Sequence, residues 1–95
     1  MLTKQTGASQ VLTATATTQT VTISANDDGL AARKVRIATQ ANPVLVAFNT
    51  STNLNVAGVL VTSNSAEHFN LEGSTKITII RATSTDALVS ITPVA

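Results

Sequence analysis

The chain has 95 residues, a mass of 9.8 kDa and a formal net charge of +1, which suits one small domain with one modest core. Charged residues make up 12% of the chain, aromatic residues make up 2%, and there is no Cys. These values exclude a disulfide scaffold, a zinc–thiolate or iron–sulfur site, and the basic stripe of a nucleic-acid-binding domain.

The residue types favour strands over helices. The chain contains 17 Thr and 10 Val, and β-branched side chains lose rotamer freedom in helices but pack well on a pleated sheet. No apolar run approaches the roughly 20 residues of a membrane-spanning helix. The N-terminus also lacks the apolar stretch of a secretory signal, so we expect a soluble chain that is used as translated and has no membrane partner.

The N-terminal segment differs from the rest because it holds almost no large apolar side chain. Val11 and Leu12 are the two side chains able to anchor it. We predict that residues 1–17 form an extended arm or an edge strand, with residues 1–8 equally suited to a frayed terminus. Residues 18–95 are predicted to form a single domain.

Alternation of apolar and polar residues, which is typical of strands, begins in residues 18–25. A second alternating strand begins at Val35, and the continuous apolar run of residues 44–48 is typical of a strand covered on both faces. Phe69 and Leu71 are expected to share one face, and further strands are expected at residues 59–61, 76–81 and 87–92. Pro93 is expected to end the last of them, because proline lacks the N–H that a ladder needs.

The breaks between these strands carry turn residues. The sequence Asn-Asp-Asp-Gly at 26–29 predicts a turn in which Gly29 adopts a positive φ. Residues 29–33 suit one helical turn. Ala41 and Asn42 are expected to be extended, because the residues ahead of Pro43 are biased away from the helical region.

Two hairpin loops are predicted at residues 72–74 and 83–86, and a polar loop is predicted at residues 49–55. Strands separated by turns about every 8–12 residues are typical of sandwiches and barrels. The sequence therefore predicts an all-β protein, a small antiparallel β-sandwich or jelly roll of about seven or eight short strands, or else a small barrel.

The chain offers few groups for catalysis. In a strand, Glu67 and Phe69 point to the face opposite His68, so adjacency creates no acid–base pair. The run Asp-Asp-Gly at 27–29 lacks the ligand spacing of a calcium loop, which makes a turn the better interpretation. We predict a protein that is not an enzyme, with no catalytic residue, no cofactor, no metal and no small-molecule substrate.

The one basic cluster consists of Arg33, Lys34 and Arg36. It suits a docking patch for an acidic protein surface, or a solvated strand edge whose charges block unwanted pairing, and we prefer the second interpretation. Together with Val11 and Leu12, these residues are the candidate partner contacts.

The scarcity of charged and aromatic residues suggests a chain that is buried in an assembly. A surface with few charges risks association, and a core with little aromatic mass gains little from each side chain it buries. Both deficits are relieved when a chain packs against copies of itself or against a larger lattice. Our first hypothesis is therefore a structural protein.

An ordered series of short motifs spans residues 35–93. It reads Val-Arg-Ile at 35–37, Asn-Pro-Val-Leu-Val-Ala-Phe at 42–48, Glu-His-Phe at 67–69, Gly-Ser-Thr-Lys-Ile at 73–77 and Ala-Leu-Val-Ser-Ile-Thr-Pro at 87–93. The series resembles a group of short β-rich virion structural proteins of tailed bacteriophages. Asn49 stands where that group tends to carry Gly, and the Thr-rich N-terminal third lies outside the resemblance.

The resemblance implies a capsid decoration, or cement, protein on the outer capsid surface, assembled in the host cytoplasm. It implies the major capsid protein and copies of the chain itself as partners, with a homotrimer favoured, and it implies no catalytic residue. A small tail, head–tail connector or fibre protein is an alternative. A carbohydrate-binding β-sandwich is another, although that class favours exposed Trp or Tyr to stack on sugar rings, and the chain has neither. A small hydrolase that depends on His68 is a third.

Overall fold

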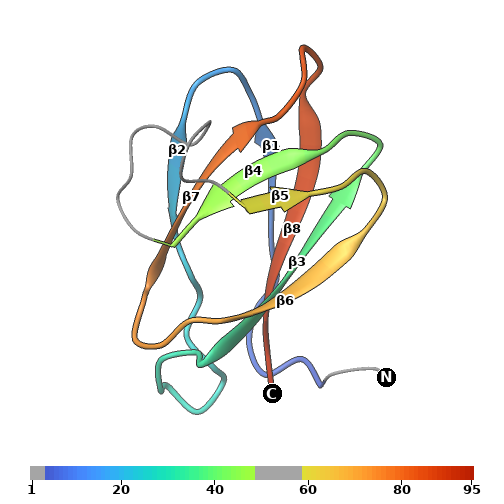
Figure 1. The fold of residues 1–95 in the computed structure, drawn as a ribbon. Helices are drawn as coiled ribbons and strands as arrows, with labels where there is room; N and C mark the ends of the chain where they lie inside the picture. The colour runs from blue at the N-terminus through green and yellow to red at the C-terminus, as the bar shows by residue number, and fades with distance from the viewer. Residues whose placement is uncertain (1–3, 49–58) are drawn as a thin grey trace.

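Eight strands form two four-stranded antiparallel sheets in the computed structural model, which describes residues 4–48 and 59–95 (Figure 1). The strands are β1 (Gln10–Ala14), β2 (Gln19–Thr22), β3 (Lys34–Gln40), β4 (Val44–Ala47), β5 (Val59–Val61), β6 (Ala66–Asn70), β7 (Lys76–Arg81) and β8 (Ala87–Val94). The first sheet has the order β1-β8-β3-β6 and the second has the order β2-β7-β4-β5. The sheets pack against each other, which confirms the predicted all-β sandwich.

The strand pairs are nested. β1 pairs with β8, β2 with β7, β3 with β6 and β4 with β5, so the chain forms one long hairpin whose closed end joins β4 to β5. Two further pairings, β3 with β8 and β4 with β7, fold this ribbon into the two sheets. Nested antiparallel pairs rolled into two sheets are the topology of a jelly roll, one of the forms that the sequence predicts.

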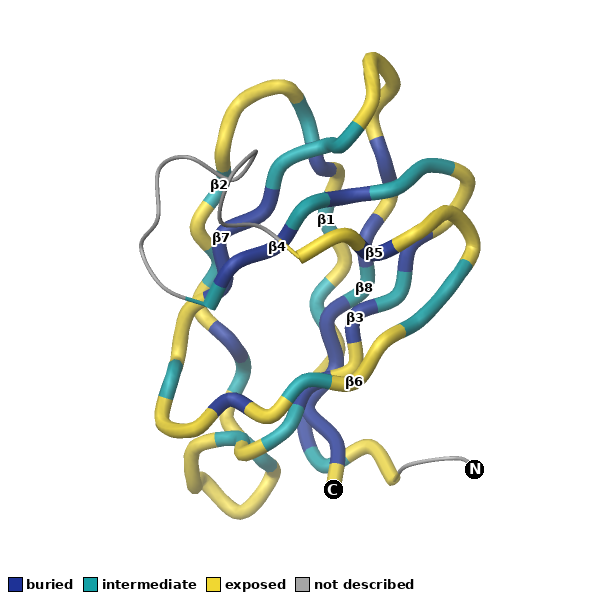
Figure 2. The backbone as a smooth tube through the Cα atoms, in the orientation of Figure 1, coloured by how far each residue is buried: buried dark blue, intermediate teal, exposed yellow. Residues whose placement is uncertain are grey.

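The core between the sheets is aliphatic and comes from alternate positions of the strands. In β3, Val35 and Ile37 are fully buried while Arg36 between them is exposed. In β8, Val89 and Ile91 are fully buried. Figure 2 shows the buried residues gathered along the inner strands, with β5 and much of β6 exposed. Each fully buried aliphatic side chain contributes about 1.5–3 kcal/mol to folding, so the inner strands supply most of the stability.

The two predicted hairpin loops are turns, but neither closes a hairpin within one sheet. Glu72 (φ 50°) and Gly73 (φ 91°) form a turn in which the Ser74 N–H donates to the Leu71 carbonyl at 2.9 Å, with the two positive φ values of a type I′ turn. This turn joins β6 of the first sheet to β7 of the second, and residues 83–86 join β7 back to β8. The hairpin prediction is wrong because the strands on either side of each turn do not pair with each other. β6, β7 and β8 instead pair with strands that lie far away in the sequence.

The sequence predicts that Pro93 ends the last strand, but β8 continues through Pro93 to Val94. The Pro93 carbonyl accepts a hydrogen bond from the Thr6 N–H at 2.9 Å, so this side of Pro93 faces the N-terminal segment. The N–H and C=O of a strand residue point to the same side. The missing proline N–H therefore faces a position beyond the end of β1, and the pairing of β8 with β3 is intact.

The loop between β2 and β3 contains the predicted turn. Gly29 has φ 85°, and its N–H donates to the Asn26 carbonyl at 2.9 Å. The Asn26 N–H donates to the Leu30 carbonyl, which closes the loop on itself instead of starting the predicted helical turn. Ala41 also differs from its prediction, because its φ of 71° is left-handed rather than extended. The polar loop predicted at residues 49–55 lies outside the described residues.

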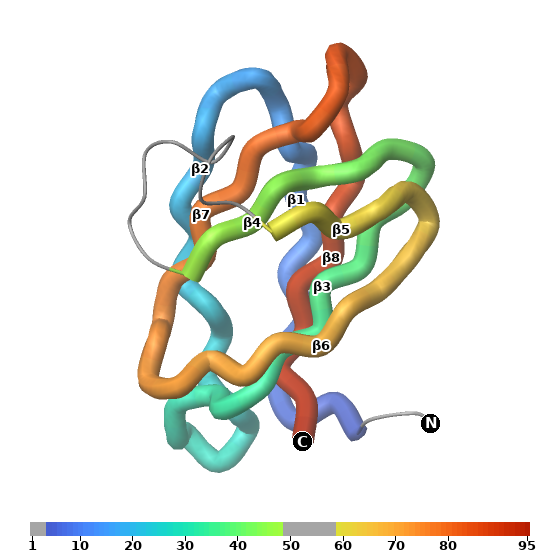
Figure 3. Tube along the Cα trace, viewed as in Figure 1, coloured from blue at the N-terminus to red at the C-terminus, as the bar shows by residue number. Residues whose placement is uncertain are grey.

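Gln10–Ala14 adopts the edge-strand form, one of the two predicted for the N-terminal segment. β1 lies at the edge of the first sheet, beside β8. Ahead of β1, the Ala95 N–H donates to the Lys4 carbonyl at 2.9 Å. The first described residues therefore run alongside the C-terminal end of β8 (Figure 3).

Candidate functional surfaces

The basic cluster does not form a single patch. Lys34 and Arg36 are alternate residues of β3, opposite Asn70 and His68 of β6, and they share the outer face of the first sheet. Arg33 precedes the strand and lines a groove at the end of the sandwich. The structure thus places two of the three basic residues together and the third in a different environment.

β1 places its two candidate contact residues on opposite faces. Val11 is 65% exposed on the outer face of the first sheet, whereas Leu12 is half-buried against the core. Of the two, Val11 is therefore the one positioned to contact a partner. Leu12 instead anchors the edge strand by packing between the sheets.

His68 lies exposed on the outer face of β6, opposite Arg36 of β3. Phe69 points the other way and packs, half-buried, against the core, as the alternation predicts. Glu67 is in register with the buried Ile37, so this charged residue lies on the inner side of an edge strand. Within the described ranges there is no group of three or more His, Cys, Asp or Glu side chains able to hold a metal ion.

An open groove of about 820 Å³ lies where the β2–β3 loop meets the β6–β7 turn. Asp28, Arg33 and Glu72 are the charged residues of its lining. A smaller hollow of about 250 Å³ adjoins it through Ala31 and Ala32. The groove offers hydrogen-bond donors and acceptors to a polar ligand. From the sequence, only the two turns can be predicted. That they lie side by side and form a groove depends on the tertiary fold and is not encoded in the residues of either turn.

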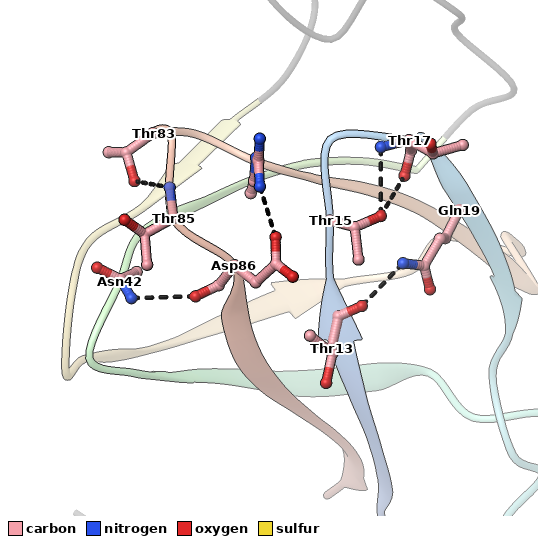
Figure 4. A network of polar contacts seen from close by, with 9 residues as sticks. Thr13, Thr15, Thr17, Gln19, Asn42, Thr83, Thr85 and Asp86 are labelled. Carbon is pink, nitrogen blue, oxygen red and sulfur yellow. Dashed lines mark hydrogen bonds and ion pairs between the residues drawn. The ribbon is translucent and has the colours of Figure 1, made fainter.

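Polar contacts tie the loops together at the other end of the sandwich (Figure 4). The Arg81 guanidinium lies 2.6 Å from the Asp86 carboxylate, and the Asn42 side-chain amide donates to the Asp86 carbonyl at 3.0 Å. On the neighbouring loop, the Gln19 side-chain amide donates to the Thr13 carbonyl at 2.8 Å. A surface ion pair adds little stability on its own, so these contacts serve mainly to fix the shapes of the loops.

One continuous stretch of the chain carries no charge. Residues 5–26 contain no Asp, Glu, Lys, Arg or His, and they supply β1 and β2, each at the edge of its sheet. We call residues 5–26 the uncharged flank. Its polar groups are neutral: the Ser9 hydroxyl lies 2.7 Å from the Thr92 hydroxyl and 3.1 Å from that of Ser90. The overall composition does not indicate this flank, but the sequence does, because no charged residue lies between Lys4 and Asp27.

No protein-family model matches the chain, and no curated protein matches it. Within residues 4–48 and 59–95, no helix is long and apolar enough to cross a membrane.

Proposed function

We propose that the chain is a non-enzymatic structural protein of a tailed-bacteriophage virion, and specifically a capsid decoration protein that binds the outer shell and stabilises the joints between capsomers. The observation that carries the proposal is the uncharged flank, which presents two neutral strand edges on one side of a very small domain. Such edges are suited to pairing with neighbouring chains.

Two further observations support the proposal. Jelly rolls recur in viral capsid proteins, and although a fold does not by itself define a function, this one agrees with the resemblance of residues 35–93 to small virion proteins. The chain also devotes only 12% of its residues to charged side chains, against about 25% in an average protein. A chain that is largely covered by its neighbours needs fewer charged residues.

The proposed mechanism is mass action. A protein that binds the assembled shell but not its separated subunits stabilises the shell by the free energy of that binding. Many copies acting on one particle make a weak individual contact effective. The proposed partners are therefore the major capsid protein and copies of the chain itself. The resemblance implies a homotrimer, whereas the free edge of β1 favours a pair of chains, and the mass of the purified chain in solution separates the two arrangements.

The test is co-sedimentation of the purified chain with shells of the phage that encodes it. Gln10–Ala14 is a strand of the sheet, so deleting the N-terminal segment would damage the fold, and a surface substitution is the sharper probe. Thr20→Lys, at an exposed position of the edge strand β2, places a charge on the uncharged flank and should lower shell occupancy at least about tenfold. Leu60→Lys, at an exposed position of the edge strand β5, is the matched control and should bind like wild type.

Absence of wild-type co-sedimentation would contradict the proposal, and loss of binding in Leu60→Lys alone would move the contact to β5. The number of copies of the chain per virion, measured by quantitative mass spectrometry of purified virions, distinguishes a decoration protein from a tail or connector protein. The copy number of a decoration protein should approach the number of capsid subunits, whereas the copy number of a connector should equal the number of subunits in a single ring.

A second candidate function is carbohydrate binding, and the open groove favours it. Jelly rolls also occur in lectin domains, and the groove presents Asp28, Arg33 and Glu72 to solvent. A glycan-array screen tests this candidate. A positive hit should be lost in Glu72→Ala, while no binding to any glycan would reject it.

A further inference from the structure

The edge of β1 differs from the edge on the other side of its own sheet. β6 carries His68 and places the charged Glu67 on its inner side, and an inward-pointing charge is a known device against unwanted strand pairing. In the second sheet, β5 is protected by its length of only three residues. β1 has five residues and contains neither a charge nor a proline. It is the longest edge strand that lacks such protection in the part of the chain that the structure describes.

The hydrogen-bond directions of β8 show which groups of β1 face outward. The Pro93 carbonyl accepts from the Thr6 N–H, and the Ala95 N–H donates to the Lys4 carbonyl. Both bonds reach the side on which β1 lies. Because the direction alternates along a strand, the odd-numbered residues of β8 bond toward β1 and the even-numbered residues bond toward β3.

The same alternation fixes the free edge of β1. The residues opposite Ile91, Val89 and Ala87 are Gln10, Leu12 and Ala14. These three therefore bond to β8, and the backbone groups of Val11 and Thr13 point away from the sheet. The side-chain amide of Gln19 donates to the Thr13 carbonyl, which agrees with this direction.

The open part of the edge has a defined length. At one end Gly7 forms a bridge with Asn26, and at the other end the Thr15 carbonyl accepts from the Arg81 N–H at 3.1 Å. The residues between these points whose backbone groups face outward are Ser9, Val11 and Thr13. Val11 lies at the centre of this stretch.

We propose that the open edge of β1 pairs antiparallel with the β1 of a second copy of this chain, across a twofold axis at Val11. The pairing joins the first sheets of the two copies into one continuous sheet. Val11 then faces the Val11 of the second copy, and Ser9 faces Thr13. The Thr13 carbonyl has a second lone pair available for this bond.

A second copy is the occupant that the strand fits best. A twofold axis brings identical regions of the two strands together, so any charge near its centre would lie close to the same charge and repel it. The uncharged flank contains no such charge. The pairing also covers Val11, which is 65% exposed and lies diagonally beside the 43%-exposed Leu88 in the β1–β8 ladder of its own chain. Burial of these exposed apolar groups favours association.

The first test is the mass of the purified chain by light scattering, over concentrations up to about 0.5 mM, a range that captures weak interfaces. We expect a dimer of twice 9.8 kDa. Val11→Lys should raise the dissociation constant at least about tenfold, because it places two ammonium groups face to face. Leu60→Lys should leave the dimer unchanged. Circular dichroism of both variants verifies that the fold is retained.

The second test is a specific cross-link. The chain has no Cys, so Val11→Cys introduces a single thiol. Residues that exchange both hydrogen bonds across an antiparallel pair have Cα atoms about 5.5 Å apart, within the range of a disulfide. Mild oxidation should convert Val11→Cys to a covalent dimer far faster than Leu60→Cys. A wild-type monomer, a mass of three chains, a dimer unaffected by Val11→Lys, or equal cross-linking of both variants would overturn the proposal.

Both tests are made without capsid shells. They therefore report on pairing between copies independently of whether the chain decorates a virion.

Discussion

Phe48 and Phe69 contact each other across the two sheets, with ring centroids 4.9 Å apart and ring planes inclined at 47°. Phe48 directly follows β4 of the second sheet, and Phe69 belongs to β6 of the first. They are the only two aromatic residues in the chain. The whole aromatic content of the protein is thus used in one contact that joins the sheets near the side opposite the uncharged flank.

This contact predicts a measurable coupling. Aromatic pairs contribute about 0.5–1.5 kcal/mol beyond the area they bury. In a double-mutant cycle of Phe48→Leu and Phe69→Leu, the free energies of unfolding should deviate from additivity by about this amount. Urea denaturation of the four proteins measures it, and strict additivity would show that the rings act independently.

The aliphatic core predicts a sharp contrast between inner and edge strands. Ile37 is fully buried in β3, and its truncation to Ala should cost about 2–5 kcal/mol. Leu60 is 50% exposed in β5, so Leu60→Ala should change stability by less than about 0.5–1 kcal/mol. The midpoints of urea unfolding compare the two variants, and similar losses for both would contradict the assignment of the core.

The left-handed φ of Ala41 predicts a substitution that stabilises the protein. A left-handed conformation costs a residue other than glycine about 1–2 kcal/mol, more than the unfolded-state entropy that a glycine adds. Ala41→Gly should therefore raise the free energy of unfolding by about 0.5–1 kcal/mol. The same change at Ala38, inside β3, should lower it by about 1 kcal/mol. Thermal unfolding of the two variants measures these changes. If both substitutions stabilise the protein, or both destabilise it, this explanation is wrong.

Gly7 predicts a site that does not tolerate a methyl group. A Cβ added there would lie 2.5 Å from the Ala25 carbonyl oxygen, which is backbone and cannot easily move. Gly7→Ala should displace the segment ahead of β1 and break the 2.7 Å hydrogen bond from the Asp27 N–H to the Thr6 carbonyl. Hydrogen exchange at the Asp27 amide should accelerate, whereas Ala8→Ser, at an exposed position, should leave it slow. Unchanged exchange in Gly7→Ala would mean that this segment is not held as described.

The strands were largely predictable because their signal is local. Alternation around Val35 and Ile37 is a consequence of which face is buried, and burial selects side-chain type at each position. The positive φ of Gly29 follows equally directly from the residues beside it. These features depend on neighbours in the sequence, so the sequence reports them.

The pairing of strands was less accessible, because it depends on contacts between distant residues. The turn at Glu72 and Gly73 has the chemistry of a hairpin, yet it connects two different sheets. The extension of β8 through Pro93 depends on what lies beside it in space. The groove lined by Asp28 and Glu72 exists only because two loops separated in sequence meet. Its residues could not be selected from the sequence alone.

The nested pairing of the strands also implies an order of folding. Closing a longer loop costs more entropy, and the two strands of the β4·β5 pair are the closest in sequence, whereas β1 and β8 lie near opposite ends of the chain. We expect the ribbon to zip outward from β4·β5, slowly, as is typical of proteins dominated by non-local contacts. β1 would then dock last, so the strand with the open edge is also the strand whose arrival completes the sandwich.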